Sequence, residues 1–184
     1  MHSKLPFTYR HIHILGASGS GTTTMAKEIC SELPFKHFDS DDYFWKVKYT
    51  ESQPRHVRLS NLKDELDKQP NWVLSGAVID WGNPLIPLFD LVVFMSVSHE
   101  ERLMRLKKRE SDRFGESILP GGDRYGEFTK FMEWANQYET GGMNVRSRLQ
   151  QESWLKSLPC EVLRINGDNS PEENLKILIE KIKG

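Results

Sequence analysis

A glycine-rich loop between a predicted strand and a predicted helix constrains the fold of this chain more than any other feature. Ile12, Ile14 and Leu15 predict a short buried strand, residues 16–21 contain three glycines, and residues 22–31 have helical character. Glycines let successive backbone N–H groups converge on one point, and the helix that follows directs the positive end of its dipole toward that point. The stretch therefore predicts a phosphate cradle that needs no side chain.

The loop fits the phosphate-loop pattern G-x-x-x-x-G-K-[ST] with one departure. Its eight residues are Gly16-Ala17-Ser18-Gly19-Ser20-Gly21-Thr22-Thr23. Thr22 stands where the pattern has lysine, whereas Thr23 keeps the hydroxyl that binds magnesium. The loop resembles that of the small nucleoside-monophosphate and metabolite kinases, and archaeal cytidylate kinases carry a similar G-S-G-T-T-T version. The resemblance implies that residues 16–24, Thr24 included, bind ATP, and that Thr22 is compatible with an active site.

Two other interpretations of the loop stay open. It can be a purely structural turn, or it can belong to an NAD(P)-binding oxidoreductase, because Asp39 lies about where a ribose-binding acid would fall. Against the second interpretation, the loop is one residue short of the G-x-x-x-G-x-G of short-chain dehydrogenases. The chain also has no Tyr-x-x-x-Lys pair.

Length and charge favour one soluble α/β domain. The chain has 184 residues, of which 38% are hydrophobic, so it can form a substantial core. Its net charge of −1 argues against a nucleic-acid partner, and no apolar run reaches membrane-spanning length. Cys30 and Cys160 lack metal-ligand spacing. We expect a single domain over residues 1–184, cytoplasmic and not bound to membranes, that acts as a monomer or homodimer.

An acidic cluster, Asp39-Ser40-Asp41-Asp42, ends the second predicted strand at residues 34–39. Ligands gather at the carboxyl ends of parallel strands, so these carboxylates should face the phosphate loop. Asp39 and Thr23 are our candidates for holding Mg²⁺. The cluster resembles the D-S-D of shikimate kinases, which implies that a later acid, Asp41 or Asp42, meets the phosphate acceptor. The alternative is that the cluster only caps a helix.

Three further strands complete the predicted sheet, at residues 71–76, 91–97 and 161–165. The almost continuous apolar run of residues 91–97 is typical of a strand covered on both faces. Ser75 lies where a Walker B aspartate is expected, which weakens any prediction of ATPase-type hydrolysis. The resemblance implies a three-layer α/β/α P-loop fold of the nucleotide-kinase type, with a five-stranded parallel sheet in the order 2-3-1-4-5.

Two segments are predicted to surround the acceptor. Residues 40–70 resemble the inserted acceptor-binding region of these kinases, and residues 110–148 resemble their lid. Candidate acceptor-binding residues, besides Asp42, are Trp45, Arg58 and Trp81. Each has a structural alternative, since the tryptophans can be packing residues and the arginine can lie on a solvated helix face.

Several arginines are candidates for contacts with phosphate. Arg105 and Arg109 are one turn apart in a predicted helix and project together. They resemble arginines of adenylate-kinase-like enzymes that contact the nucleotide, although a basic surface helix is an equal alternative. Because Thr22 removes the loop lysine, another cation must offset the charge on the transferred phosphoryl group. Arg146 and Arg148 are the first candidates for this catalytic role, with Arg109 and Arg113 next.

The sequence therefore predicts an ATP- and magnesium-dependent phosphotransferase. The acceptor would be a nucleotide, a nucleoside or a small metabolite. Because of Thr22 and Ser75, a nucleotide-binding regulatory protein with little transfer activity is the alternative.

Overall fold

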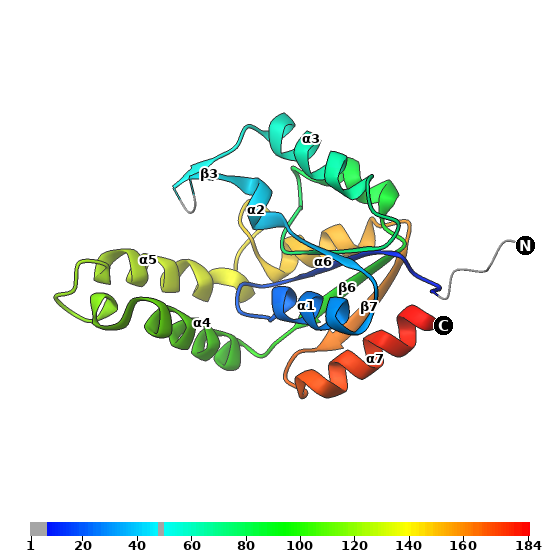
Figure 1. Cartoon of the computed structure of the whole chain (residues 1–184). Helices are drawn as coiled ribbons and strands as arrows, with labels where there is room; N and C mark the ends of the chain where they lie inside the picture. The colour runs from blue at the N-terminus through cyan, green and yellow to red at the C-terminus, as the bar shows by residue number, and fades with distance from the viewer. Residues whose placement is uncertain (1–6, 48–49) are drawn as a thin grey trace, which may run out of the picture.

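The computed structural model describes residues 7–47 and 50–184, in which strands and helices alternate along the chain (Figure 1). The strands are β1 (His11–Gly16), β2 (Lys36–Asp39), β3 (Trp45–Val47), β4 (Glu51–Ser52), β5 (Trp72–Ser75), β6 (Leu91–Ser96) and β7 (Glu161–Asn166). The α-helices are α1 (Thr22–Glu32), α2 (Ser40–Phe44), α3 (Arg55–Leu66), α4 (His99–Phe114), α5 (Tyr125–Asn136), α6 (Arg148–Lys156) and α7 (Pro171–Lys183). Short 3₁₀ helices are η1 (Asn83–Leu88), η2 (Gly115–Ile118) and η3 (Gln137–Glu139).

Five parallel strands form the main sheet in the order β2-β5-β1-β6-β7. Numbered only among themselves along the chain, they follow the order 2-3-1-4-5, as the resemblance implied. The phosphate loop leaves the central strand β1 and leads directly into α1. Dinucleotide-binding sheets usually have the order 3-2-1-4-5-6, so this sheet does not favour the oxidoreductase interpretation.

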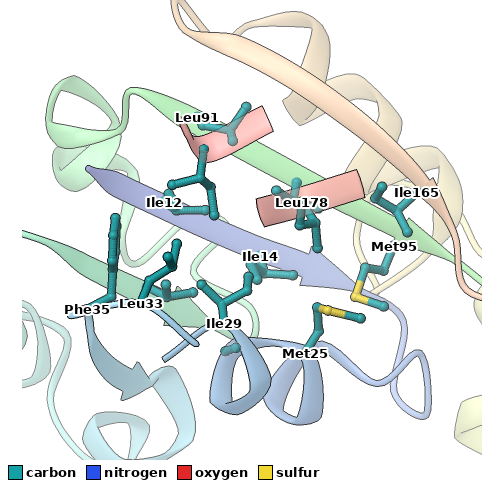
Figure 2. Packing of buried hydrophobic residues seen from close by; sticks show 14 residues of the cluster. Ile12, Ile14, Met25, Ile29, Leu33, Phe35, Leu91, Met95, Ile165 and Leu178 are labelled. Atoms are coloured by element: carbon teal, nitrogen blue, oxygen red, sulfur yellow. The ribbon is translucent and has the colours of Figure 1, made fainter. Parts of the chain in front are cut away.

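The sheet separates two hydrophobic layers. On one face, side chains of β1 pack against α1 and α7, as Ile14, Ile29 and Leu178 illustrate (Figure 2). On the other face, Leu15 and Trp154 belong to a second cluster that includes residues of α3 and α6. Burial on both sides explains why β6 is apolar along almost its whole length, since neither face meets water. The two layers hold the carboxyl end of β1 rigidly beneath the phosphate loop.

The two segments flanking the site fold mainly as helices. Residues 40–47 and 50–70 contain α2, the short antiparallel pair of strands β3 and β4, and α3. Helix α4 continues to Phe114, and α5 packs beside it, so that α4 and α5 extend together beyond the sheet (Figure 1). We call this pair, residues 99–136, the α4–α5 arm. Within residues 7–47 and 50–184, none of the helices is long and apolar enough to cross a membrane.

Candidate functional site

A cavity of about 640 Å³ lies at the carboxyl ends of the sheet strands, beside the phosphate loop. Its walls come from the loop and α1, from the ends of β2 and β5, from α4, and from the segment before α6. We call it the phosphate-loop cavity. It is lined by Gly16, Ala17, Ser18, Gly19, Gly21, Thr22, Thr23, Thr24, Lys27, His37, Asp39, Asp41, Asp42, Gly76, Ala77, Arg105, Leu106, Arg109, Arg113 and Arg146.

The loop has the backbone conformation that an anion cradle needs. Gly19 and Gly21 have φ angles of +87° and +89°, a region that side chains disfavour. Gly21 precedes α1 without a side-chain cap, and the first turn of α1 carries no acidic residue. The first backbone N–H groups of α1 are therefore left for an anion at the positive end of the helix dipole. Ser20 differs from its neighbours, because its side chain is buried under the loop and its N–H donates to the Ala17 carbonyl at 3.0 Å.

Asp39 joins the loop helix to the acidic cluster. One carboxylate oxygen accepts a hydrogen bond from the Thr23 hydroxyl at 2.9 Å, and the other accepts from the Asp41 N–H at 3.0 Å. The second bond caps α2, so Asp39 has the capping role that was the alternative interpretation and still faces the cavity. A hydroxyl and a carboxylate on a phosphate cavity fit Mg²⁺, which commonly takes one or two carboxylates, waters and substrate phosphates. In the described part of the chain, no group of three or more His, Cys, Asp or Glu side chains could hold a metal ion.

Four arginines line the same cavity as the acidic cluster. Arg105, Arg109 and Arg113 are four residues apart on α4 and share one face of the helix. Arg146 reaches the cavity from the segment before α6, where burial lowers the pKa of its guanidinium and the charge of Asp41 opposes that shift. The cavity thus brings carboxylates and guanidinium groups together.

Aromatic rings of α5 support two of these arginines. The Arg109 guanidinium lies 5.6 Å from the centre of the Phe131 ring, and that of Arg146 lies 5.8 Å from the Trp134 ring. The Phe131 and Trp134 rings stack on each other at 5.9 Å. Cation–π contacts of this kind favour a fixed guanidinium position. Helix α5 therefore orients cations from two different segments.

Arg105 is tied to the turn after β7. Its Nε donates to Glu101 at 2.7 Å, and its Nη2 donates to the Gly167 carbonyl at 3.0 Å. The contact brings the start of the arm next to the glycine turn of residues 166–168.

A buried amide fixes the start of the phosphate loop. Gln151 of α6 is 0% exposed; its Nε2 donates to the Gly16 carbonyl at 3.1 Å, and its Oε1 accepts from the Tyr138 hydroxyl at 2.5 Å. Burial, together with the nearby Glu139 carboxylate, raises the pKa of Tyr138 to about 12. The hydroxyl therefore stays protonated and can donate this bond over the physiological pH range.

A buried arginine connects the loop to the arm. Arg102 is 1% exposed, donates to the Ala135 carbonyl of α5 at 2.8 Å, and lies 3.5 Å from the Ser18 carbonyl. Its guanidinium also lies 5.0 Å from the centre of the Tyr138 ring. Burial lowers the pKa of Arg102, and nearby Glu139 opposes this shift. One side chain thus contacts both the phosphate loop and the α4–α5 arm.

The structure brings most of the predicted site residues together. The loop residues other than Ser20 line the cavity, as do Asp39, Asp41, Asp42, Arg105, Arg109 and Arg146. The predicted acceptor residues Trp45, Arg58 and Trp81 instead surround the Phe44 ring. The Arg58 guanidinium lies 4.3 Å from the centre of that ring, and the Trp45 ring meets it edge to face. A small cavity of about 110 Å³, lined by Trp81 and Arg146 among others, lies between this group and the phosphate-loop cavity.

Arg148 lies apart from the other predicted catalytic residues. It pairs with Glu139 at 3.1 Å and lines a separate cavity with Ser98 and Asp168, at the ends of β6 and β7. It is not among the residues that line the phosphate-loop cavity. The structure therefore separates Arg148 from Arg146, although only one residue stands between them.

Sequence reasoning missed several lining residues. Lys27 lies one turn after Thr23 on α1, so helical spacing could have identified it. His37 lies two residues before Asp39 on β2 and forms a 2.8 Å hydrogen bond with Ser75, the residue in the Walker B position. Burial lowers the pKa of His37, Asp39 opposes that shift, and Lys27 adds to it. Leu106 and two small residues at the end of β5, Gly76 and Ala77, complete the missed set.

Comparisons with known proteins identify relatives of this chain. No family model matches the chain. The uncharacterized protein YqaC of Bacillus subtilis is 42% identical over 171 residues, covering 93% of this chain and 96% of that protein. A cytidylate kinase of Archaeoglobus fulgidus is 31% identical over 113 residues, covering 54% of this chain and 61% of the kinase.

Solved structures show the fold. A deoxyadenosine kinase from M. mycoides with bound dATP superposes with a TM-score of 0.56 at 16% identity, covering 93% of this chain and 98% of the kinase. A shikimate kinase from Bacteroides thetaiotaomicron gives a TM-score of 0.55 at 15% identity, covering 94% and 98% of the two chains. The chain therefore has the P-loop kinase fold.

Proposed function

We propose that this chain, which belongs to the same protein family as YqaC of Bacillus subtilis, is an ATP-dependent phosphotransferase. It would move the γ-phosphoryl group of ATP to a nucleotide, a nucleoside or a small metabolite. One observation carries the proposal: the glycine loop, the acidic cluster and four arginines line a single cavity. Phosphoryl transfer depends mainly on positioning and electrostatic stabilisation, and this arrangement provides both.

The proposed roles follow from the positions of the groups. Backbone N–H groups of the loop and the start of α1 bind the polyphosphate. Thr23 and Asp39 would hold Mg²⁺, which neutralises charge on the β and γ phosphates. Asp41 or Asp42, of the acidic cluster, positions the acceptor and takes the proton when the attacking group is a hydroxyl.

Arginines would neutralise the negative charge of the transferred phosphoryl group, which the lysine of the usual phosphate loop would otherwise neutralise. Thr22 carries no positive charge. Arg146 lines the cavity, and it lies close enough to Asp41 for the charge of that carboxylate to raise its pKa. Arg146 is therefore the first candidate for stabilising the transferred phosphoryl group, with Arg109 and Arg113 of the arm beside it. The partial likeness to a cytidylate kinase supports a nucleotide acceptor, and the likeness in fold to shikimate kinase supports a metabolite.

A regulatory nucleotide-binding protein is the second candidate function. Ser75 occupies the Walker B position, and its hydroxyl forms a hydrogen bond with His37. That position therefore has no carboxylate to position a water molecule. Together with Thr22, this favours binding of a nucleotide without rapid turnover. Phosphoryl transfer to an acceptor distinguishes the two candidates.

The test has two stages. First, ATP with Mg²⁺ should raise the melting temperature of the protein, and NAD(P) should not. Second, labelled ATP is incubated with nucleotides, nucleosides, shikimate and gluconate, and transfer of label is measured. Thr23→Val, which keeps the shape but lacks the hydroxyl, should lose the magnesium dependence that Thr23→Ser retains. Absence of ATP binding would refute both candidates, while binding without transfer to any acceptor would favour the regulatory protein.

A further inference from the structure

We propose that a second cavity, between α4 and α5, is a ligand subsite for a flat aromatic ring that carries an anionic group. The inference rests on the proposed function, because this subsite would hold the part of the acceptor farthest from the phosphate loop. The cavity measures about 400 Å³, and we call it the arm cavity. It is lined by Thr50, Arg109, Glu110, Arg113, Phe114, Ile118, Arg124, Glu127, Phe128 and Phe131.

Aromatic side chains form the apolar part of the arm cavity. Phe114, Phe128 and Phe131 are all half-buried, so each leaves part of its ring uncovered by the fold. Ile118, which is 5% exposed, closes the base between them. Rings grouped in this way offer stacked and edge-to-face contacts to another aromatic ring, and an aliphatic acid has no ring with which to make them.

Three guanidinium groups share the same cavity and lie over the same rings. Arg113 and Arg124 lie 5.8 and 4.2 Å from the centre of the Phe114 ring, and Arg109 lies over Phe131. A guanidinium that lies over a ring still presents N–H groups at its edge. Such groups bind phosphate or carboxylate oxygens in pairs. The arm cavity therefore combines a stacking surface with donors for an anion.

A carboxylate of the protein already occupies the position between two of these arginines. Glu110 pairs with Arg109 at 2.9 Å and lies 3.9 Å from Arg113, and its side chain is only 12% exposed. Glu127 pairs with Arg124 at 3.3 Å. Glu110 thus shows where an anion fits between the two guanidinium groups. A ligand anion must compete with Glu110 for them, so the strength of this internal pair sets ligand affinity.

The arm cavity adjoins the phosphate-loop cavity. Arg109 and Arg113 line both, and with a rise of about 1.5 Å per helical residue they lie about 6 Å apart along α4. Thr50 of the acceptor-binding segment contributes to the arm cavity, so both predicted acceptor-enclosing segments border it. A single small molecule can therefore place its ring in the arm cavity and its reacting group near Asp41.

The experiment measures binding by calorimetry while a non-hydrolysable ATP analogue and Mg²⁺ occupy the phosphate loop. The probes are phenyl phosphate, which has a ring, and ribose 5-phosphate, which has an anionic group and no aromatic ring. Since stacking on an aromatic side chain contributes strongly to affinity, phenyl phosphate should bind about tenfold more tightly. Phe128→Leu, which keeps an apolar side chain, should remove most of that difference.

A second variant tests the internal pair. Glu110→Gln keeps the shape of the side chain and removes its charge, so both probes should bind about three to ten times more tightly because the two arginines lose their competitor. Lys107→Gln is the matched control, because Lys107 is exposed on α4 and is not among the lining residues. It should change the affinity of neither probe.

Equal affinity for the two probes, or an unchanged affinity in Glu110→Gln, would overturn the subsite. Circular dichroism of each variant verifies that it folds, and Glu110→Gln provides a test even if Phe128→Leu does not fold. The two proposals fail separately. If the ATP analogue does not bind, the proposed function is contradicted, whereas the phenyl phosphate comparison, repeated without the analogue, still decides the subsite.

Discussion

Replacing Gln151 with leucine should reveal how firmly the phosphate loop is fixed to α6. The substitution nearly preserves side-chain size but removes the donor to the Gly16 carbonyl and the acceptor for the Tyr138 hydroxyl. Gln151 is 0% and Tyr138 7% exposed, so water cannot readily replace the lost partners. An unsatisfied buried polar group costs about 1–3 kcal/mol, and two such groups should lower the free energy of unfolding by about 2–6 kcal/mol.

A second substitution, Tyr138→Phe, tests the same hydrogen bond by removing its donor. Alone, it leaves the Gln151 Oε1 without its donor and should cost about 1–3 kcal/mol. The phenyl ring remains available to the Arg102 guanidinium, so the cation–π contact is retained. Added to Gln151→Leu, however, Tyr138→Phe removes a hydroxyl that already lacks a partner. The double variant should therefore be no less stable than Gln151→Leu alone.

The assay is urea unfolding of the four proteins in the cycle, with the slope of the transition compared to verify two-state behaviour. The expected coupling between the two positions is about 2 kcal/mol. If the two costs add within about 0.5 kcal/mol, the hydroxyl and the amide do not depend on each other. The network described here would then be refuted. ATP binding gives a second measurement, because the Gly16 carbonyl lies at the start of the loop.

Three further outcomes are expected. Burial lowers the pKa of His13 to about 4, whereas the pKa of a histidine in the unfolded chain is about 6.5. Between these two pH values only the unfolded chain binds the proton. The free energy of unfolding should therefore fall by up to about 3 kcal/mol as the pH drops from about 6.5 to about 4. Urea unfolding at pH 7 and pH 5 should show about 2 kcal/mol of this loss, and His13→Phe should remove most of it. Gly21→Ala should cost about 1–2 kcal/mol from backbone strain, since the added methyl meets nothing closer than 4.0 Å. Gly19→Ala should lower the melting temperature further, because its methyl would lie 2.9 Å from a leucine of α4; equal losses would contradict the loop geometry. In phosphoryl-transfer assays, Arg146→Ala should lower kcat about a hundredfold or more. Arg148 lies outside the phosphate-loop cavity, so Arg148→Ala should have a kcat close to that of the wild type. Equal losses of kcat in the two variants would argue against the arrangement of the cavity.

The sheet could be predicted from the sequence because its strands are covered on both faces. The apolar runs that form β5 and β6 have no solvent side, so they stand out without any alternation. The β3–β4 pair was not predicted. Its strands have only three and two residues, and most of these are exposed, so no buried face imposes a pattern on them.

The phosphate loop was predictable for a different physical reason. Its chemistry lies in the backbone, and glycines mark where the backbone must turn. The buried amide of Gln151 leaves no such mark, because a glutamine in a helix is usually a solvated surface residue.

Arg146 and Arg148, at the start of α6, could not be told apart from sequence. Ser147 stands between Arg146 and Arg148, and its hydroxyl accepts from the Gln150 N–H, which makes it the N-cap of α6. The extended backbone at the cap places Arg146 before the helix and Arg148 within it. One therefore reaches the phosphate-loop cavity, and the other pairs with Glu139.

The Arg102 guanidinium donates hydrogen bonds to the carbonyls of both Ser18 and Ala135, so the phosphate loop and the α4–α5 arm are not thermodynamically independent. If a nucleotide bound at the loop strengthens or weakens the hydrogen bonds of that guanidinium, it also changes the conformational free energy of the α4–α5 arm. Linkage then requires a molecule held by the arm to change nucleotide affinity by the same factor. The two ligands would then bind cooperatively, either each raising or each lowering the affinity of the protein for the other.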